Sequence, residues 1–224
     1  MSASRVMRAA MPGHAGVVAP PNEDEQHVLV RRAILVRHGE TEWTLSGQHT
    51  SITDIPLTKH GRETARELAP LAAKTRFAMV LTSPLRRARE TCELAGLGDQ
   101  AQIEPDLIEW NYGEYEGLTA KEIHERQPGW MLFADGCPGG EGPAEVAART
   151  DRVIARIRAI EGDVALFAHG HVFRVFVARW LGLPPAAGSH FLLDPATVSV
   201  LSHYRGIPAV KGWNAPLTLN ASRT

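Results

Sequence analysis

Two apolar runs in this chain end in the same dipeptide, a histidine followed by a glycine. Ala33–Val36 leads through Arg37 to His38-Gly39, and Val164–Ala168 leads directly to His169-Gly170. Short apolar runs of this kind are typical of strands that are buried on both faces in a parallel sheet. Ligands of such sheets bind at the carboxyl ends of the strands. The repeat therefore predicts an α/β sheet with two histidines at its ligand site.

Strand-like and helix-like segments alternate along most of the chain. Strands are expected at Val28–Arg37, Ala78–Leu81, Gln102–Glu104 and Val164–Ala168, and helices at 58–74, 83–94, 119–126, 143–160 and 170–180. Thr197–Tyr204 and Pro208–Trp213 predict a hairpin around Arg205-Gly206. The alternation favours a three-layer α/β sandwich with a mainly parallel central sheet and helices on both faces. The closing hairpin would add an antiparallel edge strand.

The expected helices have recognisable start signals. Thr58 and Thr119 are placed to cap helices, and Ser83 precedes Pro84 as a cap before a proline at the first helical position. The segments 43–56 and 128–142 are rich in glycine and polar residues and read as loops or short turns.

Composition limits the classes of partner. The chain has 224 residues, 44% of them hydrophobic, and a net charge of −1, which fits one globular domain without bulk attraction to nucleic acid or anionic membrane. No apolar run reaches the ~18 residues of a membrane helix. Cys92 and Cys137 lack a paired spacing and read as reduced thiols of a cytoplasmic protein.

The N-terminal residues differ in character from the rest. Residues 1–27 carry arginines, prolines and glycines but no apolar stretch long enough for a signal peptide. We expect a flexible tail over 1–27, with a transit-like segment or a misassigned start as alternatives, and a single domain over 28–224.

A third strand end adds positive charge. Val80-Leu81 is followed by Thr82-Ser83-Pro84, with Arg86 and Arg87 about one helical turn further on. If the three strands are neighbours, their ends form a pocket with two histidines and at least two arginines. Such a pocket suits a phosphate dianion.

Four sequence blocks resemble the histidine phosphatase superfamily, the phosphoglycerate-mutase-like group. They are Arg37-His38-Gly39-Glu40-Thr41, Thr82-Ser83-Pro84-Leu85-Arg86-Arg87-Ala88, Leu107-Ile108-Glu109 and Ala168-His169-Gly170, in that family's order. The resemblance implies that His38 is the nucleophile that becomes phosphohistidine. It also implies that Arg37 and Arg87 clamp the phosphate, that His169 is the second histidine, and that Glu109 donates the proton.

The chemistry fits these residue types. An uncharged imidazole can attack phosphorus if its other nitrogen is held, for example by a backbone carbonyl. Arg37, Arg87 and a protonated His169 would offset the charge of the phosphoryl group, and burial could raise the pKa of Glu109 so that it holds a proton for the leaving alkoxide. This scheme requires no cofactor and no metal. His169 and His171 have no companion ligand motif, and neither cysteine has the arginine of a cysteine phosphatase six positions later.

Phosphatase is favoured over mutase. The stretch from Glu109 to Glu141 is short and holds only one arginine, Arg126, and no lysine-rich tail follows the domain. A 2,3-bisphosphoglycerate-dependent phosphoglycerate mutase is the alternative. A degenerate binding protein is a third possibility, but the five implied catalytic residues are all present.

Further blocks are similar to the sedoheptulose-1,7-bisphosphatase subgroup and to short bacterial acid phosphatases. They include Trp43–Thr50, Thr53–Thr58, Glu109–Gly117 and Phe191–Asp194. We therefore expect a small phosphorylated metabolite, a sugar phosphate or bisphosphate, as substrate. Substrate-binding roles are assigned to Arg37, Arg87, Thr44, His49, Thr50, Ser51, Gly170 and Arg174. Arg174 is the candidate for a second phosphate, with a structural ion pair as the equal alternative. The edge strand leaves a homodimer open.

Overall fold

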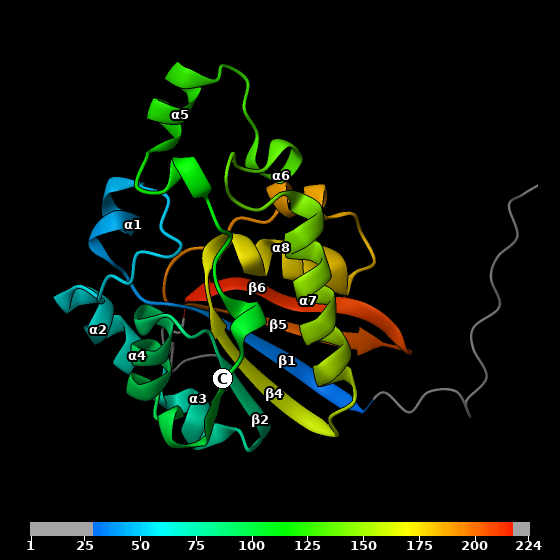
Figure 1. Cartoon of the computed structure of the whole chain (residues 1–224). Coiled ribbons are helices and arrows are strands. Elements are labelled where there is room, and N and C mark those ends of the chain that lie inside the picture. The colour runs from blue at the N-terminus through cyan, green and yellow to red at the C-terminus, as the bar shows by residue number, and fades with distance from the viewer. Residues whose placement is uncertain (1–28, 217–224) are drawn as a thin grey trace, which may run out of the picture.

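The computed structural model describes residues 29–216, which contain a six-stranded sheet in the order β3-β2-β4-β1-β5-β6 (Figure 1). The strands are β1 (Val30–Arg37), β2 (Phe77–Thr82), β3 (Ala101–Ile103), β4 (Gly162–Ala168), β5 (Thr197–Tyr204) and β6 (Ile207–Pro216). β1 to β4 run parallel, while β5 pairs antiparallel with both β1 and β6. The predicted α/β class, mainly parallel sheet and antiparallel hairpin are confirmed.

The register of the central strands places the two His-Gly pairs side by side. Arg37 at the end of β1 pairs with Ala168 at the end of β4, and the His38 N–H donates to the Ala168 carbonyl at 2.9 Å. On the other side of β4, the Ser83 N–H donates to the Phe167 carbonyl at 2.9 Å. Three strands therefore deliver His38, Ser83 and His169 to one edge of the sheet.

Helices cover both faces of the sheet. They are α1 (Glu42–Ser46), α2 (Lys59–Arg66), α3 (Ala69–Lys74), α4 (Arg86–Leu94), α5 (Ala120–Arg126), α6 (Leu132–Asp135), α7 (Pro143–Arg158) and α8 (Gly170–Trp180). Short 3₁₀ helices lie between them: η2 (Gly98–Gln100), η3 (Pro105–Leu107), η4 (Gly113–Tyr115) and η5 (Pro185–His190).

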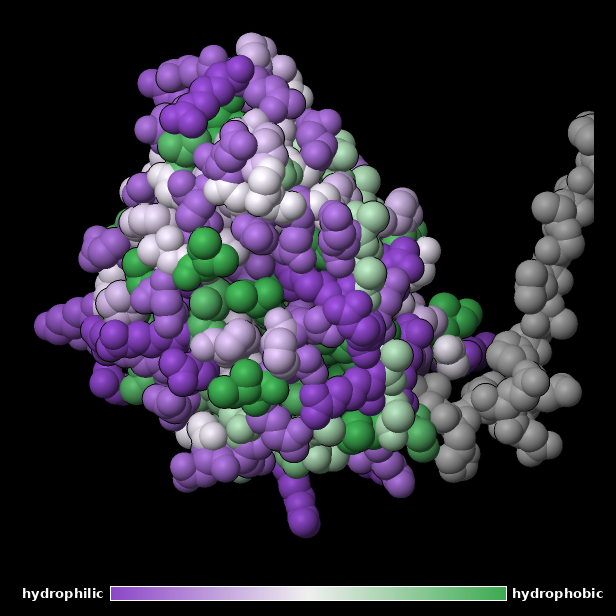
Figure 2. Space-filling model, viewed as in Figure 1, coloured by the Kyte–Doolittle hydropathy of each residue, from purple (hydrophilic) through white to green (hydrophobic). Residues whose placement is uncertain are grey.

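Alternate residues of the strands supply two hydrophobic cores. Leu35 of β1 and Leu166 of β4 belong to the core that α7 and α8 cover, whereas Ile34 and Phe167 belong to the core beneath α3 and α4. The period of two along a strand sends neighbouring side chains to opposite faces, so strands apolar throughout form the middle of three layers. On the face that Figure 2 shows, hydrophobic residues reach the surface only in small separate patches.

Three local predictions were wrong. The expected helix over 58–74 is two helices, because Pro70 cannot donate a backbone hydrogen bond and begins a new helix, α3. The expected start at Ser83-Pro84 is also wrong: α4 begins at Arg86 with Leu85 as N-cap. The segment 43–56, expected as a loop, overlaps α1, which Thr41 caps with a capping box to Thr44.

The remaining boundaries agree closely with expectation. Thr119 caps α5 in a capping box with Glu122, and α7 and α8 lie where the sequence places them. Within residues 29–216, no helix is both long and apolar enough to cross a membrane. The expected flexible tail, residues 1–27, lies outside the described residues, so the domain boundary stays a prediction.

Candidate active site

A pocket of about 300 Å³ opens at the carboxyl ends of β1 and β4. Its wall comes from several loops and from the first turns of α1, α5 and α8. The lining residues are Arg37, His38, Trp43, Thr44, Gly47, Gln48, His49, Thr50, Glu109, Tyr112, Ala120, Gly170, His171, Arg174 and Leu193. A location at strand carboxyl ends is where ligands bind in sheets of this type.

The His38 ring is held in one tautomer. Its Nδ1 lies 2.7 Å from the carbonyl oxygen of Gly39, and a carbonyl can only accept, so Nδ1 carries the proton. Burial, followed by the charges of Arg87 and Arg37, lowers the pKa of His38 well below its ordinary value of 6.5. The ring is therefore neutral at pH 7, with its lone pair on Nε2.

His169 lies beside His38, with 5.2 Å between the ring centroids. Its Nε2 is 2.7 Å from the Ser83 hydroxyl, and its Nδ1 is buried and has no partner among residues 29–216. Burial and the charge of Arg87 lower the pKa of His169 well below 6.5. The protonated His169 that the sequence suggested is thus disfavoured, because burial and the neighbouring positive charges both oppose a charged ring.

Arg37 and Arg87 bring positive charge to this site; Arg87 is fully buried and Arg37 is half-buried. Arg37 donates to the Leu193 carbonyl, and Arg87 donates to the carbonyls of Thr50, Ser51 and Thr53 at 3.0, 3.3 and 3.2 Å. In the part of the chain that the structure describes, the Nε atom of each guanidinium is buried and has no partner. Burial lowers the pKa of both arginines, but a guanidinium stays charged at neutral pH.

Gly170 allows Arg37 its position. A Cβ atom on Gly170 would lie 3.3 Å from Arg37 Cζ, tighter than most real contacts. The absence of a side chain here lets the first turn of α8 pack against the guanidinium. This is a structural reason for the glycine after His169.

Glu109 closes another side of the pocket and is fixed by backbone groups. Its carboxylate accepts from the N–H groups of Trp110 at 2.9 Å, His171 at 3.1 Å and Val172 at 2.9 Å. The last two N–H groups belong to the first turn of α8 and have no partner within that helix. Glu109 therefore caps α8 from a distant loop and is held at the pocket wall.

The structure brings most predicted substrate-binding residues to the pocket. Thr44, His49, Thr50, Gly170 and Arg174 line it. Ser51 and Arg87 do not line the pocket: both are fully buried, and the Ser51 carbonyl accepts from Arg87. The backbone N–H of Ser51 donates to Glu116, so Ser51 fixes the loop rather than facing the cavity.

Among residues 29–216, Arg174 has no carboxylate partner. Its Nε and Nη2 donate to the carbonyls of Gly188 and Ser189, each at 3.1 Å, and the guanidinium carbon lies 4.5 Å from the centroid of the Phe133 ring. Within the described residues, Arg174 therefore forms no structural ion pair. Its positive charge lies at the pocket wall, where the charge of Glu109 acts on it without a direct contact.

Sequence reasoning missed three supporting residues. Ser83 was assigned to a helix cap but contacts His169. The hydroxyl of Tyr112, which lies within the block Glu109–Gly117, forms a hydrogen bond with His171 Nδ1 at 2.6 Å. Arg149 of α7 binds Glu141 and braces the loop that carries Glu109, but an arginine within an amphipathic helix has no sequence signal that separates it from a surface residue.

Comparison with known proteins agrees with this geometry. Residues 33–216 match the model of the histidine phosphatase superfamily (branch 1). An acid phosphatase of Mycobacterium tuberculosis is 38% identical over 182 residues, covering 79% of this chain and 88% of that protein. The sedoheptulose 1,7-bisphosphatase of Saccharomyces cerevisiae is 37% identical over 187 residues, 69% of each chain.

Structural similarity extends over the same region. A solved structure of a Mycobacterium tuberculosis open reading frame superposes with a TM-score of 0.80 at 35% identity, covering 84% of this chain and 99% of that one. The matched residues include the site residues His38, His169, Arg37, Arg87 and Glu109. On the strength of sequence, fold and site together, this chain is a member of the histidine phosphatase superfamily.

Proposed function

We propose that the protein is a phosphatase that hydrolyses a small phosphomonoester, a sugar phosphate or bisphosphate, through a phosphohistidine intermediate that needs no metal. One observation carries the proposal above the others. The His38 ring is fixed with its proton on Nδ1, toward the Gly39 carbonyl, which leaves the Nε2 lone pair for attack among buried cations.

In the first step, His38 Nε2 attacks phosphorus, forming an N–P bond as the ester O–P bond breaks. The Nε groups of Arg37 and Arg87, buried without partners, would donate to the phosphoryl oxygens as charge shifts. Glu109 in its protonated form gives its proton to the departing alkoxide, which leaves as an alcohol. Bound phosphate would also favour a proton on His169, because a nearby anion stabilises the cation.

In the second step, water attacks the phosphohistidine. The Glu109 carboxylate takes a proton from the water while the water oxygen bonds to phosphorus and the N–P bond breaks. Inorganic phosphate then leaves, and His38 is neutral again. The two steps use Glu109 first as acid and then as base. This requires a carboxyl group held in one place, which three backbone N–H groups provide.

The substrate class is supported by the relatives and the pocket wall. Relatives that match over most of this domain are named acid phosphatase, sedoheptulose 1,7-bisphosphatase and glucosyl-3-phosphoglycerate phosphatase. The positive charge of Arg174 at the pocket wall would bind a second anionic group of the substrate. A cytoplasmic location is part of the proposal, because Cys92 and Cys137 are free, buried thiols.

The test is release of inorganic phosphate from a panel of sugar phosphates and bisphosphates, with a chelator present. We expect activity to persist with the chelator and to fall by about 10³-fold or more in His38→Ala. His60→Ala, an exposed histidine on α2, is the matched control and should keep wild-type activity. Acid-quenched protein from ³²P-labelled substrate should carry label that is lost in His38→Ala.

Two outcomes would contradict the proposal. Retained turnover in His38→Ala would exclude the phosphohistidine route. Interconversion of phosphoglycerates that is faster than phosphate release and stimulated by 2,3-bisphosphoglycerate would instead identify a mutase, a name that one relative of 33% identity carries.

A further inference from the structure

Two histidines in the pocket wall take no part in the proposed phosphoryl transfer. His49 and His171 lie with their rings nearly parallel, 15° between planes and 5.9 Å between centroids. Both line the pocket that contains His38 and Glu109. Their hydrogen bonds to the protein fix which ring nitrogen of each holds a proton.

His49 presents an acceptor. Its Nδ1 lies 2.8 Å from the carbonyl oxygen of Leu118, so Nδ1 carries the proton and donates it. Burial lowers the pKa of His49 below 6.5, which favours the neutral ring at pH 7. The remaining nitrogen, Nε2, then carries only a lone pair.

His171 presents a donor. Its Nδ1 lies 2.6 Å from the hydroxyl oxygen of Tyr112, whose side chain is only 2% exposed. Burial raises the pKa of Tyr112, so the phenol keeps its proton, and Nδ1 of His171 is the one acceptor within reach among the described residues. Tyr112 therefore donates to Nδ1. Burial lowers the pKa of His171 well below 6.5, so the neutral ring has its only proton on Nε2.

Both Nε2 atoms remain open to the cavity. Neither makes a hydrogen bond within residues 29–216, and neither is among the buried side-chain atoms that lack a partner there. The same wall thus offers a lone pair from His49 beside an N–H from His171. A hydroxyl group, which both donates and accepts, matches this pair.

We infer that His49 and His171 form a hydroxyl-recognition wall, which selects phosphomonoesters whose alcohol part carries further hydroxyl groups, as in sugars and polyols. The inference rests on the proposed function, because it concerns the leaving group of that reaction. Tyr112 acts as a positioning residue, since its hydroxyl holds His171 in the donor tautomer.

Other chemical groups fit this wall less well. An anionic group only accepts, so it would face the lone pair of His49 Nε2. An alkyl chain would leave both nitrogens without partners after water is displaced, and unpaired polar groups are what a hydrogen-bonding site uses to reject an analogue. Arg174, also in the wall, remains the group for a distal anion.

The experiment compares substrates that differ only in hydroxyl groups. Glycerol 1-phosphate and n-propyl phosphate share three carbons and one phosphate, and the readout is the ratio of their kcat/KM values. We expect the wild-type protein to prefer glycerol 1-phosphate by about tenfold or more. His49→Phe and Tyr112→Phe should each lower this ratio by about threefold to tenfold, whereas His49→Gln, which keeps an acceptor, should retain most of it.

The ratio separates recognition from general damage, because a misfolded or misplaced site lowers both kcat/KM values together. A wild-type ratio near one, or an unchanged ratio in His49→Phe, would overturn the inference while His38-dependent hydrolysis leaves the proposed function intact. Failure to hydrolyse either ester or any sugar phosphate would count against the proposed function itself.

Discussion

At the level of single residues, the site depends on buried imidazoles that stay neutral. His38 loses the hydration of its charged form on burial, and the neighbouring arginines add repulsion to the protonated ring. A neutral nucleophile is what attack on phosphorus requires. The same burial that prepares His38 for chemistry makes protonation costly for the folded protein.

Stability should therefore depend on pH through His38, His169 and His171, whose pKa values burial lowers well below 6.5. In the unfolded chain these rings titrate near 6.5. Below that pH the unfolded chain binds protons that the folded protein does not, so stability is complete above about pH 6.5 and is lost as pH falls. Each such ring contributes a slope of at most about 1.4 kcal/mol per pH unit.

Urea unfolding at pH 7.5, 6.5 and 5.5 measures this slope above the range in which ordinary carboxylates titrate. We expect the free energy of unfolding to fall between pH 6.5 and 5.5. His169→Gln should reduce the slope, and His60→Gln, at an exposed position, should leave it unchanged. A free energy of unfolding that stays level to pH 5.5 would show that these rings gain protons in the fold as readily as in the unfolded chain.

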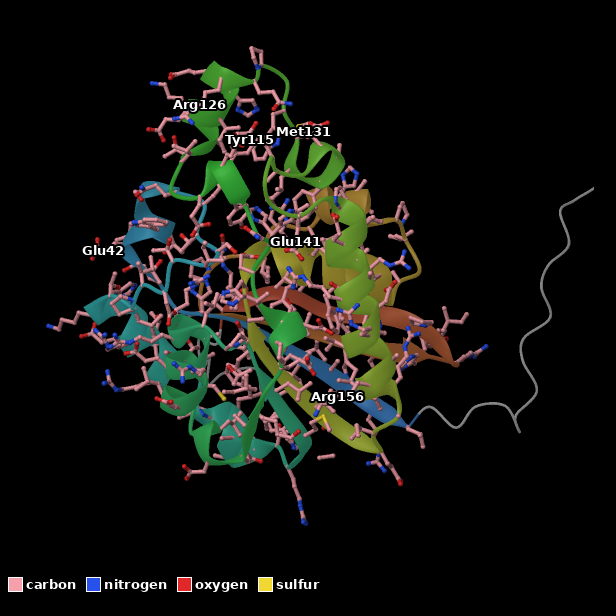
Figure 3. All side chains as sticks on the ribbon, viewed as in Figure 1. Glu42, Tyr115, Arg126, Met131, Glu141 and Arg156 are labelled. Atoms are coloured by element: carbon pink, nitrogen blue, oxygen red, sulfur yellow. The ribbon has the colours of Figure 1, made fainter. Side chains whose placement is uncertain are left out.

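At the level of elements, α7 supports the loop that carries Glu109. Arg149 of α7 donates to the carbonyls of Asp106 and Ile108 at 2.8 and 2.6 Å and to Glu141 at 2.8 Å. Glu141, just before α7 (Figure 3), in turn accepts from the Asn111 N–H at 2.8 Å. The backbone is thus held on both sides of Glu109.

Removing this support should weaken proton donation more than phosphoryl binding. Arg149→Met leaves a carboxylate and two carbonyls without their partner, and we expect a loss of about 3–5 kcal/mol in stability. The kcat for an alkyl phosphate should fall further than the kcat for p-nitrophenyl phosphate, whose phenolate leaves without a proton. Arg152→Met, one turn away in an exposed ion pair with Asp106, is the control and should leave stability close to that of the wild type. If kcat falls equally for the two substrates, Arg149 stabilises the fold without positioning Glu109.

The elements also mark where sequence reasoning succeeds. Strands buried on both faces, α5 with its cap Thr119, and the amphipathic α7 follow from local patterns, because periodicity and capping act within a few residues. The break before Pro70 and the start of α4 did not follow from such local patterns. Ser83 looked like a helix cap, but its hydroxyl bonds to His169, 86 positions away in sequence. A contact of that range has no local signature.

At the level of the whole molecule, the site exists only because distant segments converge. The ends of β1, β2 and β4, the start of α4 and the loop before η4 contribute groups that are far apart in sequence. The His-Gly pair after each of two apolar runs predicted this convergence for His38 and His169, because ligands bind at the carboxyl ends of parallel strands. The roles of Tyr112 in the pocket wall and of Arg149 behind it could not be assigned that way, because they follow from tertiary packing.

A phosphate-like anion should accordingly stabilise the entire fold, since a site assembled from these segments binds only the native state. At a phosphate or orthovanadate concentration 100 times Kd, binding adds about 2.7 kcal/mol. For a domain of this size that raises Tm by about 5–10 °C.

Adjacent arginines offer a matched comparison: Arg87 is fully buried at the site, whereas Arg86 is exposed on α4. Thermal unfolding with and without the anion should show the shift in Arg86→Met and its loss in Arg87→Met. Arg37→Gln gives the same readout should Arg87→Met fail to fold. A full shift in a folded Arg87→Met or Arg37→Gln would place the bound anion away from these guanidinium groups and break the link between the buried cations and the proposed reaction.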